Sequence, residues 1–202
     1  MKRNRPLNIE KRKDILKAAI QEFYKNGFEG SSMDAISKEA NVSKATVYNH
    51  FKNKEELFLE IANILKCRLD ESFKYSYNKS KSINKQLTDM ARKELDFLSC
   101  QENITLIQIV TVVMIQKNNI GEKILAQMTE NCMLMTAQWF EEAKKDDKLD
   151  FESSSFLSTQ FIGMIKSFAF YPQLYGAPIL SKKEGEKVIK AAVNMIKTTY
   201  GK

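Results

Sequence analysis

The sequence is poor in residues that interrupt helices. Its 202 residues include only 7 glycines and 3 prolines, whereas 43% are hydrophobic and 28% are charged. This composition excludes a collagen-like or a disordered chain and is typical of a folded globular protein. Because turn-breaking residues are few, it favours helices, either in one larger helical domain or in a small domain joined to a medium one.

Cysteine and histidine are also scarce. The three cysteines, Cys67, Cys100 and Cys132, are widely spaced and have no histidine nearby. We therefore expect no metal site and reduced, mostly buried thiols. The sequence also has no glycine-rich phosphate loop and no G-x-S-x-G elbow. These absences predict no catalytic residues and no cofactor, so we do not expect an enzyme.

Long apolar runs are missing too. The most apolar stretch, 104–115, is interrupted by polar residues and is shorter than the roughly 20 residues that a bilayer requires. Residues 1–17 are charged throughout and do not form the apolar core of a signal peptide. We therefore expect a cytoplasmic protein without a membrane span.

Positive charge is concentrated near the N-terminus. The net charge is +7, and residues 1–54 hold 12 Lys and Arg against 6 Asp and Glu, which leaves 20 against 19 for the rest of the chain. A local excess of this kind is expected where a polyanion such as DNA binds, because neutralised phosphates release counterions. A solvated lysine-rich surface gives the same count, so charge alone does not separate the two interpretations.

Apolar residues recur at helical spacing along the whole chain. In the N-terminal part, Asn8 and Gly27 bound a predicted helix over 9–26, and Ser31 or Ser32 precedes a second one. Ser43 precedes a short helix near 44–50. A longer helix begins after Asn53, which with Glu56 fits a reciprocal capping box. Further helices are predicted near 82–100, 102–116, 119–146, 153–171 and 182–199.

The predicted fold class is all-α, with about nine helices. We expect a three-helix helix-turn-helix DNA-binding domain over 1–53 and a connecting helix over 54–78. Residues 79–202 are expected to form a separate helical bundle.

The short helix near 44–50 has the geometry of a recognition helix. A helix, a turn of about four residues and a second short helix place the second helix in the DNA major groove. Val47 and Phe51 form an inward stripe, beside which His50 is expected to pack. The outward residues predicted to contact bases are Lys44, Ala45 and Asn49. The residues predicted to contact phosphates are Ser32, Ser43, Thr46, Tyr48 and Lys54. A plain helical hairpin with solvated polar residues is the alternative.

The stretch "FEGSSMDAISKEANVSKATVYNHFKNKEELF" resembles the helix-turn-helix signature of TetR/AcrR-family transcriptional regulators. The resemblance extends over about residues 8–75. Asn41 and Ala45 depart from it, because glycine is common at both positions in that family. The later stretch "QFIGMIKSFAFYPQLYGAP" is similar, more locally, to the AefR-like branch of the family. The resemblance implies that residues beyond about 80 form a divergent ligand-binding and dimerisation domain.

The C-terminal part offers candidates for both of those roles. A homodimer is expected through the helices near 153–171 and 182–199. Small residues on the first are Gly163, Ser167 and Ala169, and apolar residues on the second are Val188, Ile189, Ala192, Met195 and Ile196. The apolar residues predicted to line an effector pocket are Ile107, Val110, Met114, Met128, Met135, Trp139, Phe161, Met164 and Phe168. An ordinary bundle core has the same pattern.

Together with the family resemblance, these patterns predict a ligand-responsive transcriptional repressor. It would bind a near-palindromic double-stranded operator as a homodimer and be released by a small hydrophobic effector. The alternative is an architectural or cell-division DNA-binding protein of the same fold that has no inducer.

Overall fold

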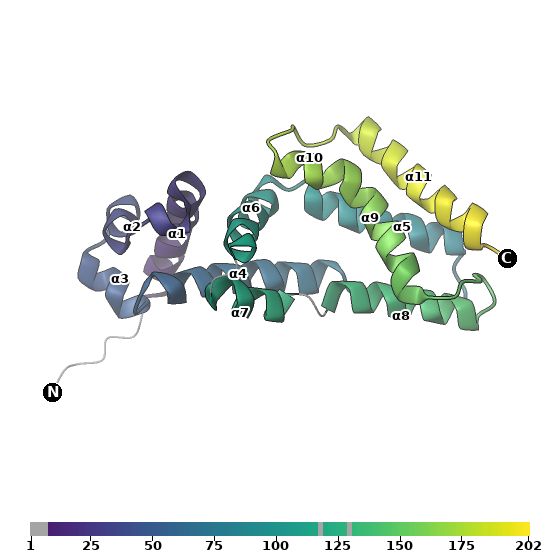
Figure 1. The fold of residues 1–202 in the computed structure, drawn as a ribbon, viewed down its shortest axis with the longest axis horizontal. Coiled ribbons are helices and arrows are strands. Elements are labelled where there is room, and N and C mark those ends of the chain that lie inside the picture. Colours follow the sequence, from purple (N-terminus) through teal and green to yellow (C-terminus); the bar gives the residue numbers. More distant parts are fainter. Residues whose placement is uncertain (1–7, 117–118, 129–130) are drawn as a thin grey trace. The chain divides into compact units, whose positions relative to one another are not determined.

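The computed structural model describes residues 8–116, 119–128 and 131–202, with side chains for all of these except 125–128 and 131–132. Within these residues the chain forms helices and no strand (Figure 1), so the predicted all-α class is confirmed. The helices are α1 (Ile9–Gly30), α2 (Met33–Glu39), α3 (Lys44–His50), α4 (Lys54–Ser72), α5 (Ile83–Leu98), α6 (Gln101–Ile115), α7 (Asn119–Met128), α8 (Asn131–Lys145), α9 (Ser154–Ala169), α10 (Tyr171–Leu174) and α11 (Lys182–Tyr200).

The predicted helix over 119–146 corresponds to two helices, α7 and α8, and the predicted break after residue 171 contains the one-turn helix α10. Pro172 lies in the first turn of α10, where proline is tolerated because that N–H has no helical partner. These two differences raise the count above nine.

The chain divides into two compact units. The first comprises 1–65 and 105–125, and the second comprises 66–104 and 126–202. Helix α4 therefore begins in the first unit and continues in the second after Leu65, and α6 returns to the first unit after Ile104.

In the first unit, buried aromatic side chains of α1 and α4 pack together. Three rings, Phe23, Phe28 and Phe58, lie with centroids 5.1–5.7 Å apart. Helix α1 leaves helical geometry at Gly27, whose φ of +69° is accessible to glycine at little cost. The turn at Gly27 lets the residues after it pack Phe28 against Phe23 and Phe58.

Helix starts follow the predicted caps closely, with one difference. The side chains of Asn8, Ser32 and Ser43 each accept a hydrogen bond from the backbone of the following turn. Asn53 Oδ1 likewise accepts from Glu56 N at 2.8 Å, but the Glu56 carboxylate accepts from Lys52 N rather than from Asn53 N. The predicted reciprocal box at α4 is therefore only half formed.

In the second unit α5, α9 and α11 pack against one another, and α8 packs against α9 (Figure 1). Helices α5 and α11 approach closely at Gly185, where an added Cβ would lie 2.6 Å from Leu95 Cδ2. Trp139 and Phe140 of α8 stack edge to face, and Phe140 contacts Phe161 of α9 in the same way.

Two sequence expectations in this unit are corrected. Four of the residues proposed as a dimer face on α11 are buried within the protomer: Val188, Ile189, Ala192 and Ile196. Ala169 of α9 is buried as well. The four residues pack inward because α11 turns its apolar stripe towards α5 and α9. The cysteines are also less buried than expected, since Cys67 is exposed and Cys100 is partly exposed, while the Cys132 side chain lies outside the described residues.

No single helix among the described residues has both the length and the hydropathy needed to cross a bilayer.

Candidate nucleic-acid interface

Helices α2 and α3 are joined by a tight turn whose geometry depends on Asn41. Asn41 has a φ of +50°, a left-handed conformation that asparagine tolerates better than most residues. The N–H of Asn41 donates to Lys38 O at 3.1 Å, and the N–H of Val42 donates to Ser37 O at 3.0 Å. Asparagine therefore supplies the left-handed conformation for which glycine is commonly used. The two hydrogen bonds also satisfy the carbonyls of Ser37 and Lys38 at the end of α2.

The inward face of α3 is fixed by packing. Val47 is fully buried and Phe51 is 2% exposed, as the four-residue spacing predicted. The Arg12 guanidinium lies 4.4 Å from the Phe51 ring centroid and pairs with Glu60 at 2.9 Å. Arg12 thus ties α1 to both α3 and α4, a role that no local sequence pattern indicated.

The outward face of α3 is solvent-exposed. Lys44, Ala45, Tyr48 and Asn49 are all exposed, and 51% of Tyr48 is accessible. Since residues three and four apart share a helix face, these side chains form one continuous exposed surface. Thr46 is only partly exposed because it lies at the edge of that surface.

The two serines predicted as phosphate contacts act as helix caps. Ser32 Oγ accepts from Ala35 N at 3.1 Å, and Ser43 Oγ accepts from Thr46 N at 3.1 Å. The Ser43 hydroxyl also shares a 2.8 Å hydrogen bond with Thr46 Oγ1. Capping uses the oxygen as an acceptor, so the Ser32 hydroxyl can still donate to an anionic oxygen at the start of α2.

Lys44 has an acidic partner that no local sequence pattern indicated. Its ammonium pairs with the Asp34 carboxylate of α2. The side chains are 61% and 51% exposed, so the pair contributes little to stability. It matters for recognition because Asp34 brings a negative charge next to the outward face of α3.

Lys54 was predicted to contact a phosphate, but its ammonium is bound to protein carbonyls. It donates to Phe28 O at 2.6 Å and to Ser31 O at 3.2 Å, with Glu29 O at 3.5 Å, and it lies 4.4 Å from the Phe28 ring centroid. The first residue of α4 therefore holds the turn between α1 and α2. Ser31 reinforces this turn, since its hydroxyl donates to Gly27 O at 2.6 Å.

His50, at the end of α3, lies beside Phe51 with ring centroids 6.5 Å apart, as expected. Among the described residues its Nδ1 is buried without a hydrogen-bond partner. Burial lowers the pKa of His50, and the nearby Arg12 and Lys11 lower it further. The imidazole is therefore neutral at pH 7.

The residues predicted to line an effector pocket are distributed over both units. Ile107 and Val110 of the first unit are buried, and Met114 is partly exposed. In the second unit Trp139 and Phe161 are buried, whereas Met135 and Met164 are partly exposed. Phe168 is 50% exposed on the surface of α9, which does not fit a buried lining role. The Met128 side chain lies outside the described residues.

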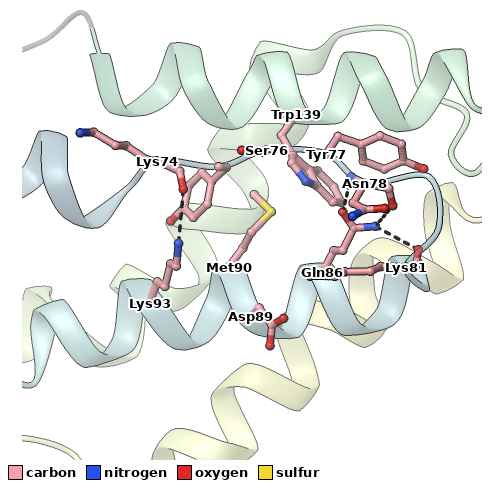
Figure 2. A pocket seen from close by; sticks show the side chains of 11 residues that line it. Lys74, Ser76, Tyr77, Asn78, Lys81, Gln86, Asp89, Met90, Lys93 and Trp139 are labelled. Carbon is pink, nitrogen blue, oxygen red and sulfur yellow. Dashed lines mark hydrogen bonds between the residues drawn. The ribbon is translucent and has the colours of Figure 1, made fainter.

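Trp139 lines a cavity of about 380 Å³ between α5, α8 and the segment that joins α4 to α5 (Figure 2). The Gln86 amide holds that segment, because it accepts from Asn78 N and donates to the carbonyls of Asn78 and Lys81. Tyr77 stacks on Trp139 at 5.4 Å. Burial, together with a 2.7 Å hydrogen bond from the Tyr77 hydroxyl to Asp146, raises the pKa of Tyr77 to about 12.

Comparison with known families gives two matches that together span most of the chain. Residues 15–61 match the family described as "Bacterial regulatory proteins, tetR family". Residues 85–202 match the family described as "AefR-like transcriptional repressor, C-terminal domain".

Individual relatives agree with these matches. A TetR family transcriptional regulator from Pseudomonas syringae pv. tomato has a solved structure that is 35% identical to this chain, with a TM-score of 0.81 over 96% of this chain and 99% of that one. The structure of the flavonoid-responsive regulator FrrA is 25% identical, with a TM-score of 0.73 over 95% of this chain and 97% of that one. The HTH-type transcriptional regulator YhgD of Bacillus subtilis is 39% identical over 85 residues, which are 40% of this chain and 44% of that protein. The chain thus spans less than half the length of this curated relative.

Proposed function

This chain belongs to the tetR family of bacterial regulatory proteins, and from that premise we propose that it is a ligand-responsive transcriptional repressor. It binds a near-palindromic operator as a homodimer and is released by a small hydrophobic effector. The observation that carries the proposal is the outward face of α3, where Lys44, Ala45, Tyr48 and Asn49 are exposed together above a packed inner stripe. Since chromosomal DNA is its target, we place the protein in the bacterial cytoplasm.

In the proposed complex α3 lies in the major groove. Lys44 and Asn49 donate to base edges, and Ala45 contacts a thymine methyl group or allows close approach. Tyr48, Thr46 and the capped N-termini at Ser32 and Ser43 contact phosphates and fix the position of α3 along the groove. Lys54 is assigned a positioning role instead, because its ammonium holds the turn between α1 and α2.

The proposed dimer uses exposed surface on α9 and α11. On α9, the residues at three- or four-residue spacing that remain accessible are Phe156, Thr159, Gly163 and Ser167. Phe156 is 63% exposed, and no atom lies within 4 Å of the position that a Cβ of Gly163 would take. On α11 the exposed residues next to the buried stripe are Ala191, Asn194 and Thr198. Two helices per subunit give a self-complementary twofold contact, and a twofold dimer would place two copies of α3 about 34 Å apart on successive major grooves.

Release by an effector requires coupling between the two units. Helices α4 and α6 each belong to both units, so a ligand in the second unit can act on the first through them. The ligand must favour the conformation that does not bind DNA, by about 1–3 kcal/mol for typical coupling. The repressor assignment is supported by the description of the family matched by residues 85–202, and a small-molecule effector is supported by the responsive relative FrrA.

The DNA-binding proposal is tested by selecting genomic fragments that the protein retains and measuring affinity for the selected site. Lys44→Ala should weaken binding about 5- to 150-fold, the equivalent of the 1–3 kcal/mol of a lost base contact. Tyr48→Phe should weaken it less, because it removes one phosphate contact. Lys52→Ala is the matched control, since Lys52 is exposed but lies outside α3. If Lys44→Ala and Tyr48→Phe both bind like wild type, the assigned contact face is incorrect.

The dimer is tested by sedimentation of Gly163→Trp. Because a Cβ at Gly163 would meet no other part of the protomer within 4 Å, a bulky side chain that starts there is expected to obstruct a partner subunit, so the variant should be monomeric with secondary structure unchanged. Gly163→Ala is the control, since a single methyl group should leave the dimer intact. A Gly163→Trp protein that remains dimeric would rule out this part of α9 as the interface.

The effector is tested by screening apolar compounds for a rise in melting temperature and for release of the selected DNA. A protein that binds its site specifically but responds to no compound would favour the architectural alternative over an inducible repressor.

A further inference from the structure

A second cavity lies within the first unit, between the C-terminal part of α1 and α6. Its volume is about 140 Å³. Phe23, Phe28, Ile109 and Val113 contribute buried apolar side chains, so they form its inner wall. Tyr24 and Val112 also line it and are 55% and 52% exposed, so they flank its opening. All of these residues belong to the unit that carries α3.

The backbone leaves this space open at Gly27, which also lines the cavity. Apart from the neighbouring residues and backbone of its own helix, no atom lies within 4 Å of the position that a Cβ of Gly27 would take. Because φ at Gly27 is +69°, a larger residue would be strained there. The turn that places Phe28 in the core therefore requires glycine, which has no side chain to fill the cavity.

The size and the lining of the cavity define what it can hold. A cavity of roughly 150 Å³ lined by apolar side chains admits one benzene molecule. An ordered water molecule would instead need two to four polar partners in the cavity wall. Here the polar side chains in the lining are Tyr24 and Gln108, and the Gly27 carbonyl already accepts a hydrogen bond from the Ser31 hydroxyl. We propose that this cavity binds one small, neutral, apolar ring compound of about six to nine non-hydrogen atoms.

The occupant would contact α1 and α6 at the same time. It would also contact Phe28, whose ring faces the Lys54 ammonium at 4.4 Å and packs against Phe58 of α4 at 5.1 Å. Binding therefore stabilises the first unit directly, whereas the 380 Å³ cavity belongs entirely to the second unit. The site goes beyond the proposed function, and its test does not involve DNA.

Benzene and pyrazine are suitable probes because they have the same shape, while pyrazine carries two nitrogens that need hydrogen bonds. Benzene at ten times its dissociation constant should raise the melting temperature by about 3–6 °C, and pyrazine at the same concentration should raise it by less than 1 °C. In methyl-labelled protein, benzene should shift the resonances of Ile109, Val112 and Val113. Equal effects of both probes, or methyl shifts confined to other residues, would overturn the proposal.

A filling variant provides the second test. Val112→Phe should occupy the cavity from its opening and weaken benzene binding at least tenfold, without lowering the melting temperature, because Val112 is already half-exposed. Ile115→Phe is the matched control: Ile115 lies one turn further along α6, is 72% exposed and is not part of the lining, so benzene should bind this variant as it binds wild type. Unchanged benzene affinity in Val112→Phe would overturn the assignment, and so would an equal loss in both variants.

Discussion

Replacing Lys54 by methionine tests whether this residue holds the turn between α1 and α2 or contacts a DNA phosphate. Methionine keeps an unbranched apolar stem but removes the charge and all three donors. The ammonium donates to Phe28 O and Ser31 O, and hydrogen bonds from a charged group contribute about 1.5–3 kcal/mol. We expect Lys54→Met to lower the free energy of unfolding of the first unit by that amount. For a chain of this size the melting temperature should fall by about 3–12 °C.

DNA binding distinguishes this positioning role from a phosphate contact. A lost phosphate contact would reduce the slope of log affinity against log salt by about 0.9, because one fewer counterion is released. A lost positioning contact would weaken binding but leave the slope unchanged, because the same phosphates are still touched. Lys52→Met is the control, and its melting temperature should match that of wild type, since surface changes usually cost less than 0.5 kcal/mol. If Lys54→Met keeps the wild-type melting temperature and loses about one unit of slope, the positioning role is refuted.

Three further outcomes are expected. Asp34→Asn removes the negative charge beside Lys44. Because that charge repels DNA phosphates, the variant should bind DNA about 3- to 10-fold more tightly at low salt, with little change in melting temperature. Weaker binding would contradict this expectation. Because the pKa of His50 is lowered in the folded protein, its neutral form contributes stability that is complete above the unfolded pKa near 6.5 and is lost as pH falls through the folded value. The melting temperature of His50→Gln should therefore fall less than that of wild type between pH 7 and 5. Parallel falls in the two proteins would count against this reasoning. Because the pKa of Tyr77 is raised to about 12, the stability from its neutral form is complete below pH 10 and is lost from there to about pH 12. Absorbance titration near 295 nm should lose a step near pH 12 in Tyr77→Phe, and an unchanged curve would exclude the assignment.

Periodicity predicted which face of α3 is buried and which is exposed, because the signal is local. Val47 and Phe51 are four residues apart, so their burial also determines that Lys44 and Tyr48 point outward. The partners of Lys54 lie 23–26 residues earlier in the chain, and Asp34 lies ten residues before Lys44. No repeat pattern encodes contacts at such separations, which depend on how helices are placed by tertiary packing.

The C-terminal part was harder to interpret for a different reason. Helix α11 carries an apolar stripe whose spacing is the same whether it faces its own protomer or a partner. Val188 and Ile189 proved to be core residues, because α5 and α9 are available inside the protomer to cover them. The same ambiguity affected Phe168, whose apolar character suggested a pocket although half of it is exposed. An apolar pattern indicates that a residue is covered but does not identify what covers it.

The division of the first unit between 1–65 and 105–125 bears on how the protein is made. A nascent chain that has emerged only as far as α4 lacks the α6 segment, including Ile109 and Val113, that completes this unit. This segment is complete only after α6 ends at Ile115, 43 residues beyond the end of α4 at Ser72, which takes a few seconds at typical bacterial elongation rates. During that interval Phe23 and Phe28 lack their α6 neighbours, so these apolar side chains are available to a chaperone.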